Sequence, residues 1–276
     1  MSGRRVAWLF LAGCCAVAGG CRKTPPAQAA DASKSPYLPV DAAVAAVTDV
    51  APVPVPAPEP ETPKVHPAAK ERPYPLKTLD DLATSPAARE VLDMMTNPKR
   101  GSEALDRLRG MGKPGLDLVR SALMATNRDV RIQAALLLGN LKDSSKETVK
   151  ALVDAVLLDP DPDARATAAR VFVVVKAPEA LVPLVRSVRE DPFEGARANA
   201  AWALGSVGGA GAIQPLREAL KDPDTWVRLR AVSSLKKLKA RVAVPDLLDH
   251  FRNDANPMVR DRAREALKDL TGKEPK

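Results

Sequence analysis

The stretch Asp222-Pro223-Asp224-Thr225-Trp226-Val227-Arg228-Leu229-Arg230-Ala231 decides the fold, because its pattern recurs along the C-terminal part of the chain. In each copy an arginine is followed by an alanine three residues later and by a large apolar residue seven residues later. The arginines are spaced 34, 32, 31 and 32 residues apart: Arg131, Arg165, Arg197, Arg228 and Arg260. Offsets of three and seven lie on one face of a helix. A period of this length predicts repeated helical units.

The two companion positions describe how such helices pack. The alanines are Ala134, Ala168, Ala200, Ala231 and Ala263, and the large residues are Leu138, Phe172, Leu204, Leu235 and Leu267. The same register, without its arginine, fits Gly101, Ala104 and Leu108 and makes a sixth copy. We expect the small residue to let neighbouring helices approach and the large one to fill the space beside it.

A second apolar segment follows each of the first five copies, at 116–125, 149–158, 181–188, 213–220 and 244–251. We interpret each copy and the segment after it as a helical hairpin, with the last copy lacking its second helix. Neither helix can bury its apolar face alone, so the hairpins stack. The segment from Leu79 to Met95, capped by Ser85 with Pro86 in its first turn, is expected to cover the N-terminal end. The prediction is an all-α solenoid of about six stacked hairpins.

From about Pro98 to Thr271 the pattern resembles the HEAT repeat family. In particular it resembles the bilin-lyase type of HEAT-like repeat, with the rough consensus D-P-x-x-x-V-R-x-x-A-x-x-A-L-G. The copies that carry the resemblance are the stretch quoted above and Arg197-Ala198-Asn199-Ala200-Ala201-Trp202-Ala203-Leu204-Gly205. The resemblance implies a scaffold that presents an extended surface to a protein partner. A lyase-like or chaperone function related to the bilin-lyase proteins is the alternative, and it rests on fold analogy alone.

The first residues have the pattern of an export signal. Arg4 and Arg5 precede an uncharged run over 6–20, which is shorter than the roughly 20 apolar residues of a membrane-spanning helix. Val17-Ala18-Gly19-Gly20-Cys21 resembles the lipobox of bacterial lipoproteins, which implies a lipidated Cys21 as the first mature residue. Cys14 is an alternative that leaves a hydrophobic run of only eight residues, and a plain secretory signal is another. Because Arg22 stands where an aspartate commonly retains lipoproteins at the inner membrane, the resemblance implies the outer membrane, facing the periplasm.

The segment after the signal is rich in proline and alanine. Thirteen of the 26 prolines lie between Arg22 and Leu76, and that stretch contains no glycine. Proline fixes φ and removes a hydrogen-bond donor, so we expect an extended, disordered tether. The predicted organisation is a signal peptide at 1–20, the tether at 21–76 and the repeat domain at 77–276.

Acidic residues stand six positions before four of the repeat arginines. The pairs are Asp159 and Arg165, Asp191 and Arg197, Asp222 and Arg228, and Asp254 and Arg260. A catalytic site needs one pair with divergent pKa values, whereas these pairs recur at every layer. We therefore interpret them as a structural ladder that joins adjacent repeats.

The composition argues against catalysis and cofactor binding. The chain has two histidines, His66 and His250, and its three cysteines all lie within the first 21 residues. This leaves too few ligands for a metal site and lacks the His-Glu pairs of helical-repeat hydroxylases. No phosphate-binding glycine loop is present, because Gly205, Gly208, Gly209 and Gly211 are assigned to a turn between helices. We expect no enzyme activity, no cofactor and no small-molecule substrate.

Charge and aromatic residues bear on the kind of partner. The net charge of +8 becomes +6 after loss of Arg4 and Arg5, both signs are interspersed, and export argues against a nucleic-acid partner. Trp226 and Phe193, just before the repeat arginine, are candidate exposed contacts for a protein partner, and local packing against the next turn is the equal alternative. Trp202 is assigned to the core.

A basic stripe on the second helices supplies the remaining candidate contacts. The candidates are Arg186, Arg189, Arg217 and Lys221, accompanied by Lys146, Lys150 and Arg252. Such a stripe would favour an acidic partner. It is mixed with Asp154, Glu190, Glu218 and Asp249, and we favour an ordinary solvated face as its interpretation.

Overall fold

A computed structural model describes residues 67–68 and 74–276 of the chain. The proposed signal peptide, Cys14, Cys21 and nearly all of the predicted tether lie outside the described residues. Within 74–276 the chain is helical, and its only β-type pairing is an isolated parallel bridge between Lys77 and Ala125. Among these residues, no helix combines the length and the apolar character needed to cross a bilayer.

The α-helices of this part run in the following order: α2 Leu79–Leu82, α3 Pro86–Met95, α4 Gly101–Met111, α5 Lys113–Ala122, α6 Arg128–Leu141, α7 Lys146–Leu158, α8 Pro162–Val175, α9 Leu181–Glu190, α10 Glu194–Val207, α11 Ile213–Ala219, α12 Thr225–Lys237, α13 Val244–Asn253 and α14 Pro257–Thr271. Short 3-10 turns precede α4, α9, α11 and α13. The all-α solenoid predicted from the repeat is confirmed.

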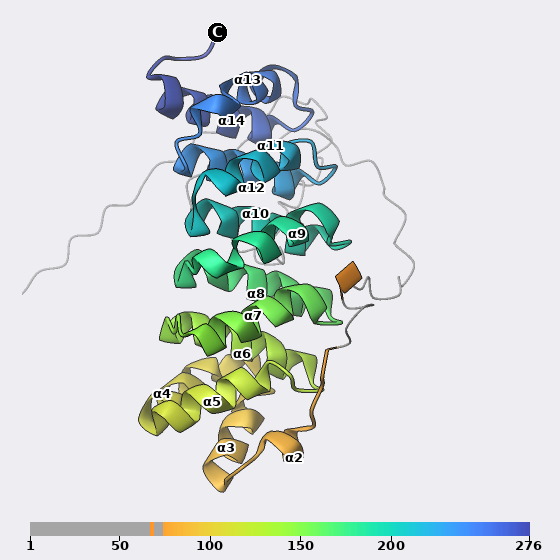
Figure 1. Cartoon of the computed structure of the whole chain (residues 1–276), viewed down its shortest axis with the longest axis vertical. Helices are drawn as coiled ribbons and strands as arrows, with labels where there is room; N and C mark the ends of the chain where they lie inside the picture. Colours follow the sequence, from red (N-terminus) through yellow and green to blue (C-terminus); the bar gives the residue numbers. More distant parts are fainter. Residues whose placement is uncertain (1–66, 69–73) are drawn as a thin grey trace, which may run out of the picture. The chain divides into compact units, whose positions relative to one another are not determined.

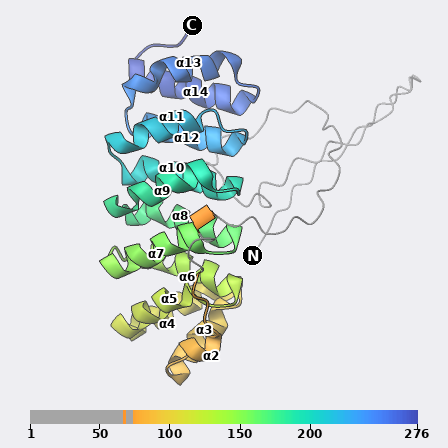
Figure 2. The same ribbon diagram turned by 45° about the vertical axis from the view of Figure 1, so that its right-hand side comes forward.

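The helices form two stacked layers (Figure 1 and Figure 2). We call the helices that carry the repeat arginines, α6, α8, α10, α12 and α14, the B helices, and each packs on the next. The helices before them, α5, α7, α9, α11 and α13, are called the A helices. Because every unit buries its apolar face against its neighbours, the core is continuous along the stack.

The predicted pairing of helices into hairpins is wrong by one helix. Each B helix packs most closely on the A helix that precedes it, as in the pairs α7 with α8, α9 with α10 and α13 with α14. The last B helix therefore does not lack a partner. A repeat period reveals the length of a unit but not where the unit begins. The two helices of a hairpin are joined by the short Asp-containing turn, not by the longer connection after the B helix.

The repeat positions are confirmed as the centre of the core. All five alanines three residues after the arginines are 0% exposed, and the large residues seven after are 0–2% exposed. The copy without an arginine follows the same rule at Ala104 and Leu108. The expected cap at Ser85 is also present, with its side chain accepting from the Ala88 N–H.

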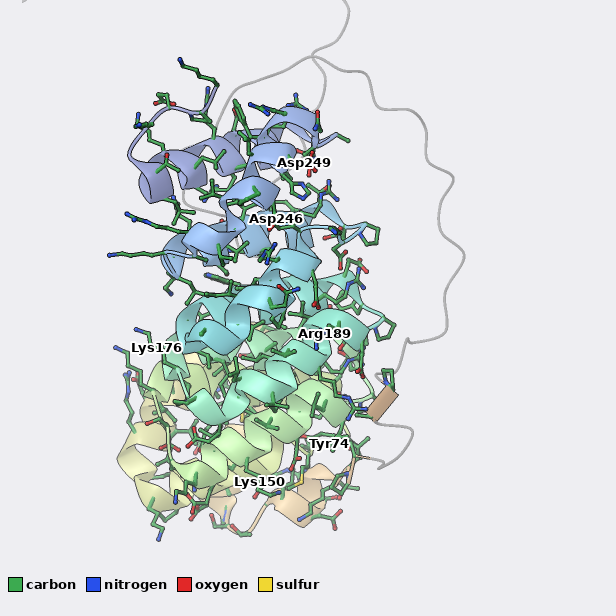
Figure 3. All side chains as sticks on the ribbon, turned by 45° about the horizontal axis from the view of Figure 1, so that its top comes forward. Tyr74, Lys150, Lys176, Arg189, Asp246 and Asp249 are labelled. Carbon is green, nitrogen blue, oxygen red and sulfur yellow. The ribbon has the colours of Figure 1, made fainter. Side chains whose placement is uncertain are left out.

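Three B helices end in a residue with left-handed backbone. Lys142, Lys176 and Gly272 have φ of 54°, 53° and 73°. Lysine is uncommon in this conformation, but its charge lies beside the negative end of the helix dipole. Lys176 lies at the opposite edge of the stack from Tyr74 and Arg189 (Figure 3).

Gly205 does not belong to the turn to which the sequence pattern assigned it. It lies inside α10 and faces Ser234 of α12, where an added β-carbon would be 2.7 Å from the serine Cβ and 2.9 Å from its Cα. The Ser234 hydroxyl also donates to the Ala201 carbonyl at 2.8 Å. Gly208 and Gly209, with φ of 85° and 86°, do form the turn.

Tyr74, the first residue of the continuous described segment, is already packed against the repeats. The Tyr74 hydroxyl donates to the Leu123 carbonyl at 2.9 Å, and its ring packs against the core. The Lys77 N–H donates to the Met124 carbonyl at 2.6 Å, and the Thr126 N–H donates to the Lys77 carbonyl at 2.7 Å. Residues 74–77, which we call the strap, are therefore tied to the turn between α5 and α6.

The Gly205 contact generates a stability test. Gly205→Ala should lower the free energy of unfolding by about 1–3 kcal/mol, because the new methyl group overlaps the backbone of α12. Gly110→Ala in α4 is the matched control. Nothing lies within 4 Å of its added carbon, so we expect no loss or a gain of about 0.5–1 kcal/mol. Urea unfolding of both variants measures the difference, and equal stabilities would contradict the close approach of α10 and α12.

Candidate functional site

The turn between an A helix and a B helix is built in the same way in successive units. In the α9–α10 turn, the Asp191 carboxylate accepts from the Phe193 N–H at 3.0 Å. Arg197, six residues on, donates from Nη1 to the Asp191 carbonyl at 3.0 Å. The arginine and aspartate therefore satisfy backbone groups that the helix ends leave open.

The remaining edge of each arginine reaches the carboxylate of the next turn. Nε and Nη2 bind its two oxygens at 2.7 and 2.9 Å for Arg131–Asp159, 2.8 and 2.9 Å for Arg165–Asp191, 2.8 and 3.0 Å for Arg197–Asp222, and 2.9 and 3.0 Å for Arg228–Asp254. We call this series the arginine ladder.

The prediction that side chains six residues apart pair with each other is wrong. Arg165 contacts the backbone carbonyl of Asp159, at 3.0 Å, and pairs with the carboxylate of Asp191. The side-chain pairs thus join consecutive units, not the two ends of one turn. An extended arginine carries donors on two edges, so one guanidinium holds its own turn and the following turn together.

The ladder ends differently at its two ends. At the N-terminal end Ala125 occupies the aspartate position, and Arg131 Nη1 donates to its carbonyl at 2.8 Å in the turn that the strap covers. At the C-terminal end Arg260 donates to the Asp254 carbonyl at 2.8 Å, and no carboxylate of residues 74–276 forms an ion pair with it.

The pKa values of the ladder carboxylates shift in opposite directions in the middle of the ladder and at its C-terminal end. The side chains of Arg165 and Asp191 are both 0% exposed. Burial also raises the pKa of Asp159 against the opposing effect of Arg131. At Asp254 burial acts in the same direction, but hydrogen bonds from Arg228, the Asn256 N–H and His250 outweigh it and lower the pKa to about 2. For the inner pairs, the cost of burying two charges offsets much of their attraction. These pairs therefore fix the geometry between units more than they add net stability.

The only histidine among the described residues contacts the ladder. His250 Nδ1 lies 2.9 Å from Asp254 Oδ2, which also binds Arg228 Nε at 2.9 Å. The carboxylate is thereby used as a structural acceptor. Within the described part of the chain, no group of three or more metal-ligating side chains is assembled.

The basic stripe of the A helices is neutralised by acidic neighbours. Arg186 pairs with Glu190 at 2.9 Å, Arg189 with Glu218 at 2.8 Å and Arg217 with Asp246 at 2.6 Å. Lys150 similarly pairs with Asp154 at 3.0 Å, whereas Lys221 is exposed. The mixed solvated face favoured from the sequence matches these contacts.

The aromatic candidates lie differently from what the sequence pattern predicts. Trp226 is half-buried and packs against the core, which favours local packing over an exposed contact. Phe193 is also half-buried, at the start of α10. Trp202, expected inside the core, is instead half-buried with the Arg230 guanidinium carbon 4.0 Å from its ring centroid. The core assignment of Trp202 relied on its neighbours Ala201 and Ala203, which are indeed buried, although position 202 itself faces outward.

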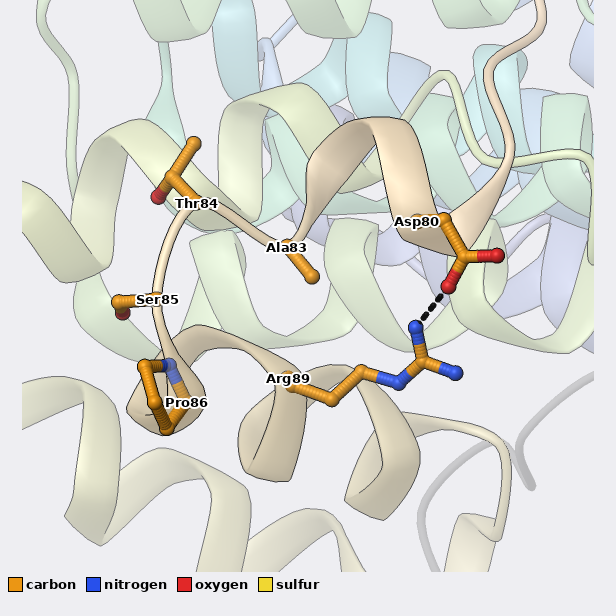
Figure 4. Close-up of a pocket in the computed structure, with 6 residues that line it drawn as sticks. All are labelled: Asp80, Ala83, Thr84, Ser85, Pro86 and Arg89. Carbon is orange, nitrogen blue, oxygen red and sulfur yellow. Dashed lines mark hydrogen bonds and ion pairs between the residues drawn. The ribbon is translucent and has the colours of Figure 1, made fainter.

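A shallow depression of about 360 Å³ lies between α2 and α3 (Figure 4). Asp80, Ala83, Thr84, Ser85, Pro86 and Arg89 line it. Arg89 pairs with Asp80 across it, and Ser85 is occupied as the cap of α3. The polar groups are thus engaged with one another, and the depression is not a candidate active site.

The HEAT-repeat family matches residues 116–194 and 182–268, which together span more than half of the 276 residues. The chain therefore belongs to the HEAT-repeat proteins. No curated protein matches it.

Several solved structures are similar to this chain. The phycocyanin lyase complex of CpcE and CpcF from Nostoc sp. matches at 22% identity and a TM-score of 0.52, over 57% of this chain and 65% of that chain. An archaeal HEAT-like repeats protein from Thermococcus onnurineus matches at 13% identity and a TM-score of 0.49, over 66% and 80%. Human deoxyhypusine hydroxylase matches at 22% identity and a TM-score of 0.33, over 70% and 88%. At 22% identity the likeness to the phycocyanin lyase complex extends to the fold alone.

The buried ladder generates a second prediction. Arg165→Met should lower the free energy of unfolding by about 3–5 kcal/mol, because it leaves the Asp191 carboxylate buried and unpaired. The double variant Arg165→Met, Asp191→Leu should recover much of that loss. Arg260→Met, at the open end, is the control and should change stability by less than about 1 kcal/mol. Urea unfolding measures all three, and equal losses at 165 and 260 would contradict the role assigned to the inter-unit pair.

The pKa of Asp254 generates a prediction for acid stability. Since its pKa falls to about 2 in the folded protein, its contribution is complete above the usual carboxyl pKa near 4 and is lost as the pH falls through about 2. Asp254→Asn should therefore shrink the difference in unfolding free energy between pH 5 and pH 2. Asp249→Asn removes an exposed carboxyl on the same helix and serves as the control. An unchanged difference in the Asp254 variant would contradict the assignment.

Proposed function

We propose that this chain is a lipid-anchored scaffold of the bacterial cell envelope that binds another protein through its HEAT repeats and carries out no catalysis. The observation that supports this function is the repetition of the same contacts at every layer. Among the described residues, the bidentate arginine–aspartate pairs of the ladder hold the units in register. What the stack offers to a partner is a long row of helix faces.

The anchoring part of the proposal rests on the N-terminal sequence. A short hydrophobic run ends at Val17-Ala18-Gly19-Gly20-Cys21, and a proline-rich segment separates it from the repeats. A lipidated cysteine would fix one end of that segment at the membrane. A proline-rich spacer extends about 3.1 Å per residue, so the repeats would sit tens of ångströms from the lipid surface. The proposed location is the outer membrane, on its periplasmic side.

Metabolic labelling with a fatty acid tests the anchor in a Gram-negative bacterial host. The protein should be labelled, and Cys21→Ala should abolish the label and release the protein from the membrane fraction. Cys14→Ala is the matched control and should leave both unchanged. Loss of the label in the Cys14 variant alone would move the anchor to that cysteine. Absence of label in the unaltered protein would refute lipidation.

Partner binding is tested separately by crosslinking in intact cells, followed by identification of the attached protein. The expected product is a defined adduct through the repeat domain. Its absence across crosslinkers of different length would contradict the scaffold function without bearing on the anchor.

A further inference from the structure

One face of the B helices lies outside the repeated arginine, alanine and large apolar positions, and its residues differ from unit to unit. The positions two before and two, five and nine after the repeat arginine are spaced four, three and four apart. They therefore lie on one side of the helix, away from the buried alanine and large apolar residue. On α8, α10 and α12 these positions form what we call the B-helix stripe: Asp163, Thr167, Arg170, Val174, Gly195, Asn199, Trp202, Ser206, Trp226, Arg230, Ser233 and Lys237.

Contacts between neighbouring helices join the stripe across α8, α10 and α12, with Gly195, Asn199 and Arg230 buried within it. Arg230 of α12 lies over the ring of Trp202 of α10. Further along the same two helices, Lys237 Nζ donates to Ser206 Oγ at 2.8 Å. Between α10 and α8, Asn199 Nδ2 donates to the Ala166 carbonyl at 2.9 Å. Side chains of the stripe thus contact the neighbouring B helix between α8 and α10 and between α10 and α12.

Two cations of the stripe, Arg170 and Lys237, differ from the paired cations of the A helices. The one acid of the stripe, Asp163, is paired with Arg128 at 2.7 Å. Arg170 and Lys237 form no ion pair with any carboxylate of residues 74–276, in contrast to the paired arginines of the A helices. Burial lowers the pKa of Arg170, and burial together with the nearby charge of Lys176 lowers that of Lys237. The negative charge of an incoming carboxylate would act in the opposite direction and favour the charged form of both side chains.

The aromatic residue in the middle of the stripe supplies an anchor. Trp202 is half-buried with the Arg230 guanidinium over its ring, and Arg170 stands at the same register position on α8. Tryptophan and arginine are the residues most enriched at positions that dominate protein binding. Val174 of the stripe adds an apolar side chain that is 48% exposed.

The extent of the cationic surface indicates the kind of ligand. On α6 the stripe positions include Asp129, and on α14 they include Glu265 and Asp269, so acids bound the surface at both ends. Three adjacent helices at about 9 Å spacing cover roughly 18 Å, the length of about six extended residues. A nucleic-acid strand running along the stack would place its phosphates against the flanking acids. A short peptide would not.

We propose that the B-helix stripe of α8, α10 and α12 binds an extended acidic segment of the protein partner. Trp202 packs against that segment, and Arg170 and Lys237 pair with its carboxylates. This inference rests on the proposed scaffold function and assigns it to the B-helix face instead of the charge-paired A-helix face.

Fluorescence anisotropy with a defined probe tests the proposal. The probe is a fluorescein-labelled octapeptide of alternating glutamate and alanine, added to the purified full chain, and the same peptide with glutamine is the comparison. The glutamate peptide should bind more tightly, and added salt should weaken it. Trp202→Ala and Arg170→Gln should each weaken binding roughly tenfold, the loss typical of a dominant contact. Arg186→Gln, on the A-helix face, is the matched control and should have no effect.

Thermal melts of the same variants separate binding from folding. If Trp202→Ala lowers the melting temperature strongly, Trp202→Phe and Arg170→Gln carry the test. Equal binding of the two peptides, or equal effects of Arg170→Gln and Arg186→Gln, would overturn the proposal. So would tighter binding of a labelled oligothymidylate through the same residues. A crosslinked partner in cells that is lost with A-helix variants and retained with stripe variants would overturn this inference while leaving the scaffold function intact.

Discussion

The bidentate pairing of an arginine in one unit with an aspartate in the next is the constraint on which this structure depends. Each guanidinium also holds a carbonyl of its own turn, so the pairing sets the distance and the rotation between consecutive units at once. The buried alanines and the close approach at Gly205 agree with that spacing. Replacing such a pair by apolar residues is often neutral for stability, whereas removing one partner is not. We therefore attribute to the ladder a role in register more than in net stability.

The two helix layers treat surface charge in opposite ways. On the A helices, arginines pair with glutamates and aspartates within the layer, and the surface is neutralised. On α8, α10 and α12, two tryptophans and three cations share the B-helix stripe with a single acid that is already paired. The ladder itself lies at the turns, away from both faces. The asymmetry between the faces is what makes the B-helix face the better candidate for recognition.

Much of the fold could be predicted from the sequence because the same residue offsets recur in every copy of the repeat. The alanines and large apolar residues were predictable, since their offsets from the arginine recur. The pairing of helices into hairpins was not, because a period has no starting point. The partner of each aspartate was equally ambiguous, as both the arginine six residues later and the one in the preceding unit satisfy the spacing. Trp202 was misassigned since its buried neighbours suggested the core, although its offset from Arg197 places it on the outward side.

The ladder has a consequence for how such a chain can change in length. Each unit brings one arginine that points forward and one aspartate that receives the preceding arginine. Excision of Pro162 to Phe193 would leave Arg197 six residues after Asp159, in the same relation to that turn as Arg165 has now. Arg131 would still meet Asp159, and Arg197 would still meet Asp222. After duplication of the unit, each arginine would likewise meet the aspartate of the following turn. The number of units can therefore vary by whole copies without leaving an unpaired charge inside the stack.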